Sequence, residues 1–419
     1  MLSFERGSGD RPALSRCVGR DRSADFDRTH WAQLPLLTEA SALPASFEDL
    51  FNAEAADDLI SQRALRTPFM RMAIEGSVLN PSKYTAPGGF GAEVGDQVSS
   101  EKVLAEFAAG ATIVLQGLHR TWPPLIDFTR ALVDEIGHPV QVNAYITPAS
   151  SRGFDPHYDV HDVFVLQIAG EKHWRIHEPV HEDPLRDQPW SDHRAAVASR
   201  AEQQPHIDQV LRPGDALYLP RGWIHSAEAQ GGTSIHLTIG VAAYTRADVA
   251  EALLARIGET GALRTSLPFG ADFSDVEQLL PLVETVAEEL RAMLAAPDDR
   301  AEAVRRAHDV SAALTRRLSA ATRPEPVSPL ATVDAIAALS GWSVVRWRDS
   351  LRATVSADRE SVRIAVGGRT VVLPREAAPA IERLYEGSPV AVDELPGLDA
   401  DSALVVVRRL LREAIVVPV

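Results

Sequence analysis

Between Gln141 and about Ala243, the chain consists of short stretches in which apolar and polar residues alternate. Glycine, proline and aspartate separate these stretches, which is the pattern of strands joined by turns. We predict a β-sandwich or barrel here, with Ala169-Gly170-Glu171 as a hairpin turn. The predicted strands cover Val142 to Ile146, Val163 to Ile168, His173 to His177, Ala216 to Leu219 and Ser234 to Val241.

Helical periodicity appears on both sides of this region. Before it, Pro123-Pro124 begins an amphipathic pattern that ends at Gly137. After it, residues from Ala247 to about Leu318 are predicted to be helical. Apolar positions such as Val276, Leu280 and Val283 recur at a spacing of three to four residues, and such stripes require a partner surface.

The two ends of the chain have different patterns. Residues 1–25 are rich in arginine and are predicted to form a flexible tail, while Arg323 to Pro329 has the composition of a linker. After the linker, a helical stretch is followed by two strand-like runs, Val362 to Val366 and Thr370 to Leu373, which suggests a winged-helix-like module.

Composition restricts the class of protein. With 45% hydrophobic and 24% charged residues, the chain has an ordinary soluble globular composition. The net charge of −16 argues against direct binding to nucleic acid, and the last segment, 331–419, is nearly neutral with 11 Arg against 12 Asp plus Glu. No apolar run is long enough to span a membrane. The single cysteine, Cys17, excludes an internal disulfide framework and fits the cytoplasm.

One polar motif suggests a metal site. His157 and Asp159 are two residues apart, so on a strand they would share a face. The segment Gly214 to His225 passes from a predicted strand through a Pro/Gly turn and offers His225 as a third ligand. Two histidines and one carboxylate leave three positions of an octahedral ion open, which suits iron or manganese, whereas structural zinc takes four protein ligands. Taken alone, His-x-Asp also fits an exposed polar strand end.

The run from His157 to Trp174 resembles the JmjC/cupin ribosomal oxygenases, which include bacterial arginyl hydroxylases and nucleolar histidyl hydroxylases. The resemblance spans about residue 30 to the C-terminus and is strongest from 140 to 240. It also rests on Asn143 to Pro148, Gly214 to His225, Trp31 to Leu37 and Gly110 to Leu115.

The resemblance implies an α+β protein whose core is a double-stranded β-helix, the jelly-roll or cupin fold of JmjC domains. A helical dimerisation region and a C-terminal winged-helix-like domain would follow this core. The expected division is a tail at 1–25, the oxygenase domain at 26–245, the dimerisation domain at 246–322 and the winged-helix-like domain at 330–419.

The resemblance also implies roles for particular residues. His157, Asp159 and His225 match the Fe(II) ligands. Lys172, Tyr145 and Thr238 match groups that bind the distal carboxylate of 2-oxoglutarate, and Asn143, two residues before Tyr145, would lie near the metal. Lys172 is one of only three lysines in the chain. The alternative interpretations are a surface turn for Lys172, barrel packing for Tyr145 and a solvent-exposed strand face for Thr238. We predict the remaining clustered histidines to lie on the surface: His161, His173, His177, His181 and His193.

The implied activity is hydroxylation of a protein side chain with Fe(II), 2-oxoglutarate and O2, by a cytoplasmic homodimer. The substrate would be a protein or peptide, and a ribosomal protein is one candidate. Lys172 stands where some bacterial arginyl hydroxylases have arginine, so arginine specificity is not implied. The alternatives are a hydroxylase of a peptide or small metabolite, and a non-catalytic metal-binding cupin that acts as a scaffold or regulator.

Overall fold

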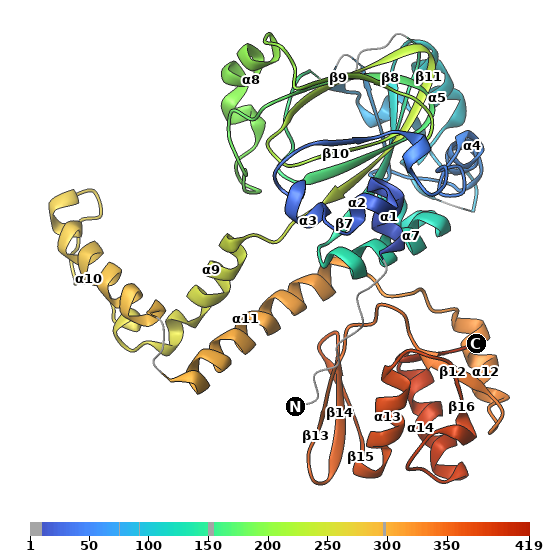
Figure 1. Ribbon diagram of the computed structural model, residues 1–419, viewed down its shortest axis with the longest axis vertical. Coiled ribbons are helices and arrows are strands. Elements are labelled where there is room, and N and C mark those ends of the chain that lie inside the picture. The colour runs from blue at the N-terminus through green and yellow to red at the C-terminus, as the bar shows by residue number, and fades with distance from the viewer. Residues whose placement is uncertain (1–10, 75, 92, 150–154, 296–298) are drawn as a thin grey trace.

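The computed structural model describes residues 11–419 apart from 75, 92, 150–154 and 296–298. Figure 1 shows three parts: a body built around a large curved sheet, an arm of helices that projects from it, and a C-terminal module beside the arm. This mixture of an antiparallel sheet with separate helical elements is the α+β organisation expected from the sequence.

The body contains one nine-stranded antiparallel sheet. Its order is β1-β10-β8-β11-β7-β6-β2-β3, and β9 pairs with the far end of β8. The long strands β8 and β11 pair with each other along most of their length and with different neighbours at their two ends, so the sheet curls around an interior. The bounds are β1 Leu36–Thr38, β2 Met70–Ile74, β3 Ser77–Val78, β6 Thr112–Leu115, β7 Val140–Thr147, β8 Asp162–His177, β9 Ile207–Leu211, β10 Ala216–Leu219 and β11 Ile224–Val241.

The predicted hairpin turn at Ala169-Gly170-Glu171 is wrong, because β8 continues through it without a break. Gly170 has a φ of +62°, and a Cβ atom there would lie 2.2 Å from the carbonyl oxygen of Thr233. The pairing register with β11 shifts between Gln230 and Ile235, opposite this glycine. Gly170 therefore marks a bulge with close backbone approach, which a glycine in a strand can signal as well as a turn.

The N-terminal segment is helical from Pro12 onward, which corrects the flexible tail expected for residues 11–25. Leu14, Cys17 and Val18 have the i, i+3, i+4 spacing of a buried helix face and belong to the core of the body. The Glu135 carboxylate accepts hydrogen bonds from the first turn of this helix. Residues 1–10, the rest of the predicted tail, lie outside the described residues. The helices here are α1 Pro12–Val18, α2 Arg20–Ser23 and α3 Phe26–Thr29.

The other helices of the body lie outside the sheet. The longest is α7, Pro123–Ile136, which begins at the predicted Pro-Pro pair and ends at Gly137 in the left-handed conformation. The remaining elements of the body are α4 Ala53–Gln62, α5 Ser100–Ala108, α6 Leu118–Thr121, α8 Arg194–Ala201 and the short strands β4 Thr85–Ala86 and β5 Gln97–Val98.

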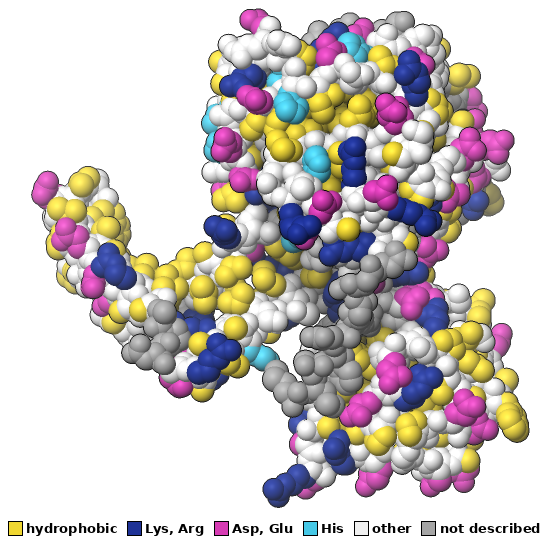
Figure 2. All heavy atoms as spheres, in the orientation of Figure 1, with side chains coloured by type: hydrophobic (Ala, Val, Ile, Leu, Met, Phe, Trp, Pro, Cys, Tyr) yellow, Lys and Arg dark blue, Asp and Glu magenta, His cyan; other side chains and the backbone are white. Residues whose placement is uncertain are grey.

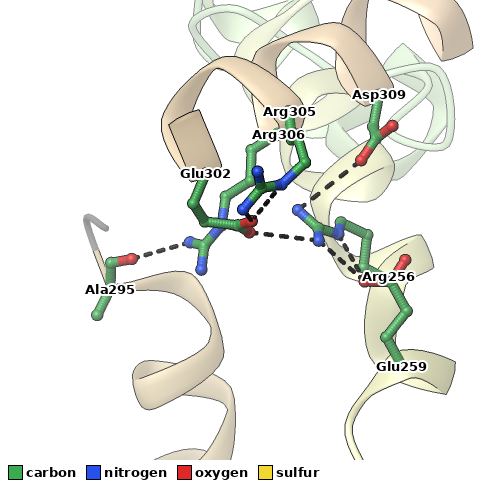
Figure 3. Close-up of polar contacts among 7 residues, drawn as sticks. All are labelled: Arg256, Glu259, Ala295, Glu302, Arg305, Arg306 and Asp309. Carbon is green, nitrogen blue, oxygen red and sulfur yellow. Dashed lines mark hydrogen bonds and ion pairs between the residues drawn. The ribbon is translucent and has the colours of Figure 1, made fainter. Parts of the chain in front are cut away.

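The arm consists of α9 (Arg246–Leu254), α10 (Val276–Leu294) and α11 (Arg300–Ala321). Figure 3 shows how polar contacts join the turn after α9 to the start of α11: Glu302 binds Arg305 and Arg306 on its own helix and Arg256 across the gap. These side chains are partly exposed to solvent, so each ion pair contributes modestly to stability. The contact between Arg256 and Glu302 is the one of these three that joins the turn after α9 to α11.

The C-terminal module has its own hydrophobic core around Trp347, Ile364, Ile381 and Leu410. It combines helices with two three-stranded antiparallel sheets, β13-β14-β15 and β16-β12-β17, and the strands β14 and β15 contain the two strand-like runs expected from the sequence. No helix in the described part of the chain is long and apolar enough to cross a membrane. The elements are α12 Pro329–Ala337, β12 Val344–Trp347, β13 Thr354–Ala357, β14 Ser361–Val366, β15 Arg369–Pro374, α13 Ala378–Tyr385, β16 Val390–Ala391, α14 Ala400–Arg412 and β17 Val416–Pro418.

Candidate metal centre

The side chains of His157, Asp159 and His225 meet inside the curled sheet. Their candidate ligand atoms all lie within 4.8 Å of one another, and His225 Nε2 is 3.8 Å from Asp159 Oδ2. His157 and Asp159 precede β8 rather than lying within it. An isolated bridge joins His157 to His225 near the start of β11, with backbone hydrogen bonds of 3.2 and 2.8 Å. The bridge explains how two segments 66 residues apart present their side chains to one point.

Local backbone contacts favour the protonation states that a metal needs. Nδ1 of His157 lies 2.7 Å from the carbonyl oxygen of Asp155, and Nδ1 of His225 lies 3.1 Å from that of Trp223. When each Nδ1–H donates to its carbonyl, the lone pair is on Nε2, which can then bind a metal. Burial and the neighbouring His157 lower the pKa of His225, which keeps its ring neutral.

Asp159 is suited to be the anionic ligand. Burial raises the pKa of this carboxyl, but electrostatic interaction with the nearby imidazoles of His161, His225 and His157 outweighs burial and lowers the pKa below its ordinary value. The carboxylate is therefore ionised at neutral pH. One carboxylate and two neutral imidazoles form the facial ligand set that leaves three positions of an octahedral ion open.

These three residues border a cavity of about 200 Å³. Of the other residues assigned from the sequence, Tyr145, Lys172 and Thr238 also line it, so six of the seven predicted site residues surround one space. Asn143 is not among the lining residues. Its side-chain oxygen accepts a hydrogen bond of 3.1 Å from the backbone N–H of Gly117.

Lys172 is a buried cation, with 3% of its surface exposed. Its Nζ donates to Thr147 Oγ1 at 3.3 Å, and no carboxylate in the described part of the chain forms an ion pair with it. Burial lowers the pKa of this ammonium from 10.5 to about 7. A buried ammonium that lacks a counterion in its own chain is well placed to receive an anionic ligand.

Tyr145 faces the same cavity from β7. It lies opposite His236 of β11 in the antiparallel register, and the two rings are stacked with centroids 5.1 Å apart. Burial, followed by the charge of Asp159, raises the pKa of the Tyr145 hydroxyl, so the hydroxyl stays protonated and can donate a hydrogen bond. Thr238, two residues after His236 on β11, lines the cavity beside it.

The sequence analysis assigned no role to several further lining residues, among them Thr147, Trp174, His236 and Arg71. Thr147 and His236 could have been found, because each is two residues from an assigned residue on the same strand face. Trp174 follows Lys172 by the same spacing. Arg71, on β2, is in no motif, and only the pairing of β2 with β6 brings it to the cavity.

The five histidines expected on the surface do not share one environment. His173 is partly exposed and contacts Asp208 on β9. His177 is only 2% exposed, so the surface assignment is wrong for this residue. His181 and His193 stack on each other with ring centroids 4.7 Å apart in the segment between β8 and β9.

Comparison with known proteins identifies a domain family and relatives for this part of the chain. Residues 124–249 match the family model of the JmjC domain. Ribosomal oxygenase 1 of Rattus norvegicus is 36% identical over 209 residues, which cover 45% of this chain and 33% of the relative. The bifunctional lysine-specific demethylase and histidyl-hydroxylase NO66 of Drosophila persimilis is 30% identical over 240 residues, 54% of this chain and 31% of the relative. The chain thus matches about a third of the length of these relatives.

Solved structures show the same fold. The Escherichia coli protein YcfD aligns with 94% of this chain and 98% of its own, at a TM-score of 0.51 and 18% sequence identity. The ribosomal oxygenase YcfD in complex with cobalt and 2-oxoglutarate has the same coverage and identity, with a TM-score of 0.50. Together with the JmjC match, these alignments confirm the jelly-roll expectation for the curled sheet.

Proposed function

We propose that this chain, which carries a JmjC domain, is an Fe(II)- and 2-oxoglutarate-dependent oxygenase that hydroxylates a protein side chain. The observation that carries the proposal is one cavity that joins a two-histidine, one-carboxylate cluster to a buried lysine with no carboxylate partner among the described residues. The relatives named ribosomal oxygenase and histidyl-hydroxylase support it, and they make ribosomal proteins the first substrates to test.

The residues present fit the implied metal and co-substrate. His157, Asp159 and His225 would hold the metal, and the open positions would receive the 2-oxo acid group and dioxygen. When bound, the iron and its co-substrate supply the oxidising power that converts a C–H group to an alcohol. The ligand set alone suits manganese as well as iron.

The protein's own residues would orient the co-substrate. Lys172 would pair with the distal carboxylate of 2-oxoglutarate, and the Tyr145 and Thr238 hydroxyls would hydrogen-bond to it. The curled sheet would shield this ion pair from water and so strengthen it. The proposed place of Asn143 near the metal rests only on its position two residues before Tyr145 on β7.

The proposal is tested by succinate formation from 2-oxoglutarate. Purified protein with Fe(II), ascorbate and air is expected to form succinate, and the signal should increase when a hydroxylatable substrate is added from a ribosomal protein fraction. Chelator-treated protein without added iron should form none. If metal binds but no succinate appears even with cell lysate, the scaffold alternative replaces the oxygenase.

We further propose that the chain is a homodimer that pairs through the arm. On α10, Val276, Leu280 and Val283 follow i, i+4, i+7 spacing and are 74%, 50% and 61% exposed. No described residue of this helix is buried, although its composition is amphipathic. Figure 2 shows hydrophobic side chains gathered along the arm. A two-fold axis would let the stripe cover itself in a second copy.

Two charges introduced into the apolar stripe test this dimer. Leu280→Glu with Val283→Glu should convert the dimer to a monomer, because four carboxylates would then be buried in one apolar interface. Light scattering after size-exclusion chromatography measures the mass. Thr285→Glu, which adds a charge on the opposite side of α10, should leave the dimer intact. A wild-type monomer at micromolar concentration would contradict the proposal.

We also propose a cytoplasmic location. The buried Cys17 and the lack of other thiols support a reducing compartment.

A further inference from the structure

A second cavity lies where the body, the end of α11 and the C-terminal module meet. It has a volume of about 260 Å³ and is bordered by α7, by the segment after α11 and by the loop after β12. Five arginines line it: Arg120, Arg130, Arg323, Arg348 and Arg352. Asp134 is the only carboxylate among its lining residues. Such a concentration of positive charge stands out in a chain with a net charge of −16.

The few acceptors near this cavity are already engaged. Asp134 binds Arg352 at 3.1 Å and also accepts from the Ser350 hydroxyl. Arg130 lies 3.1 Å from Asp127. Arg348 donates to the carbonyl oxygens of Glu325 and Ala414.

Arg120 and Arg323 differ from the other three arginines. Among the described residues, neither forms an ion pair with a carboxylate, and both line the same cavity. Their charges are felt by the neighbouring His119, whose pKa falls to about 4 mainly through burial and then through Arg120 and Arg323. The ring of His119 is therefore neutral at physiological pH.

Two N–H groups converge on the neutral ring of His119. The backbone N–H of Val142 donates to Nδ1 at 3.1 Å, and Nε–H of Arg120 is directed at Nε2 at 3.3 Å. A neutral imidazole has only one acceptor nitrogen, so the ring cannot accept both hydrogen bonds at once. With the shorter bond from Val142 in place, the ring proton is on Nε2, and this N–H and the Nε–H of Arg120 each need another acceptor.

Thr129 supplies an independent indication. It lies on α7, lines the cavity and is only 6% exposed, yet its Oγ1 has no hydrogen-bond partner in the described part of the chain. Buried hydroxyl groups are normally hydrogen-bonded, and an unpaired one calls for a water, ion or ligand.

We propose that this cavity binds a small multivalent oxyanion, a phosphate or a polycarboxylate, between Arg120 and Arg323. The anion would accept from His119 Nε2–H, from Arg120 and from the Thr129 hydroxyl, which pairs the donors that are unmatched in the free protein. The proposal is independent of the oxygenase activity.

Isothermal titration calorimetry of the full chain with pyrophosphate and with citrate tests the proposal. We expect saturable one-to-one binding of at least one probe, and at least about tenfold weaker binding in Arg120→Gln/Arg323→Gln, because two charge-assisted contacts are lost. Arg363→Gln, which removes an arginine paired with Asp358 on the C-terminal hairpin, should bind as the wild type does. Preference for pyrophosphate identifies a phosphate ligand, and preference for citrate a polycarboxylate. Equal affinity in the double variant and the wild type would overturn the proposal.

A second measurement needs no variant. Crystals of the wild-type chain grown with tungstate should show anomalous density between His119 and Arg323. Absence of density there at a tungstate concentration that saturates other surface sites would overturn the proposal, whatever the variants do.

Discussion

Replacing His157 with alanine is expected to lower succinate formation by at least about 100-fold. Loss of groups that merely support a metal ligand already costs about 10- to 100-fold in affinity or activity, and His157 is proposed to be a ligand itself. Asp159 and His225 would remain, but they occupy only two of the three positions needed to hold the ion in a facial set. The iron content of the purified variant and its rate of 2-oxoglutarate turnover measure the effect.

The matched control is His173→Ala. His173 lies on β8, points away from the cavity, is partly exposed and contacts Asp208. Its removal should leave turnover within about twofold of wild type, since surface substitutions of this kind change stability by only about 0.5 kcal/mol. Turnover of His157→Ala above a tenth of the wild-type rate would contradict the assignment of the metal site.

Replacing Lys172 with methionine should raise the KM for 2-oxoglutarate on the order of 100-fold, with iron binding unchanged. Removing one partner of a buried ion pair costs about 3 kcal/mol, because the remaining charge is left unpaired in a site without water. Methionine has a similar length and carries no charge. The ligand-free variant should therefore be at least as stable as the wild type, since a buried ammonium without a carboxylate partner has been removed.

The pH dependence of 2-oxoglutarate binding by the wild-type protein gives a separate test of the proposed ion pair with Lys172. Burial places the pKa of Lys172 at about 7 in the ligand-free protein, and a bound dicarboxylate would raise it. Above pH 7, binding of 2-oxoglutarate should therefore take up a proton, and the apparent Kd should weaken as the pH rises toward 9. Calorimetry in buffers of different ionisation enthalpy counts the protons. Lys172→Met should show no such uptake, and Lys102→Met should behave as the wild type. A pH-independent Kd in the wild type would contradict the proposed ion pair.

The free energy of unfolding of the ligand-free protein should increase as the pH rises, whereas the affinity for 2-oxoglutarate should fall. Between pH 7 and the ordinary lysine pKa of 10.5, the unfolded chain holds the Lys172 proton and the folded chain does not. The unfolded state then binds more protons, so this residue increases the free energy of unfolding as the pH rises through that window. Below pH 7 both states hold the proton and the contribution no longer changes.

Local sequence patterns were sufficient for much of the fold and of the candidate site. Short apolar runs bounded by glycine, proline and aspartate identified β7, β10 and both halves of β8. β10 and the first half of β8 are buried on both faces, which is why their runs are almost continuously apolar. The Pro-Pro start and Gly137 end of α7 were readable, since proline and glycine act through their own backbone restrictions. The two-residue spacing of His157 and Asp159 and the turn before His225 pointed to one metal, and these side chains do meet.

Other features depended on contacts that no local pattern contains. Gly170 suggested a turn, but whether a glycine bends a strand or ends it depends on the strand that passes opposite, here β11 at Thr233. The helix with Leu14 and Cys17 lies in an arginine-rich segment that was taken for a tail, and its apolar face packs into the core of the body. Arg71 reaches the candidate site only through strand pairing. Likewise, the second cavity collects Arg120 and Arg323 from segments two hundred residues apart. Sequence periodicity reports which face of an element is buried, whereas the tertiary structure alone decides which elements share an interior.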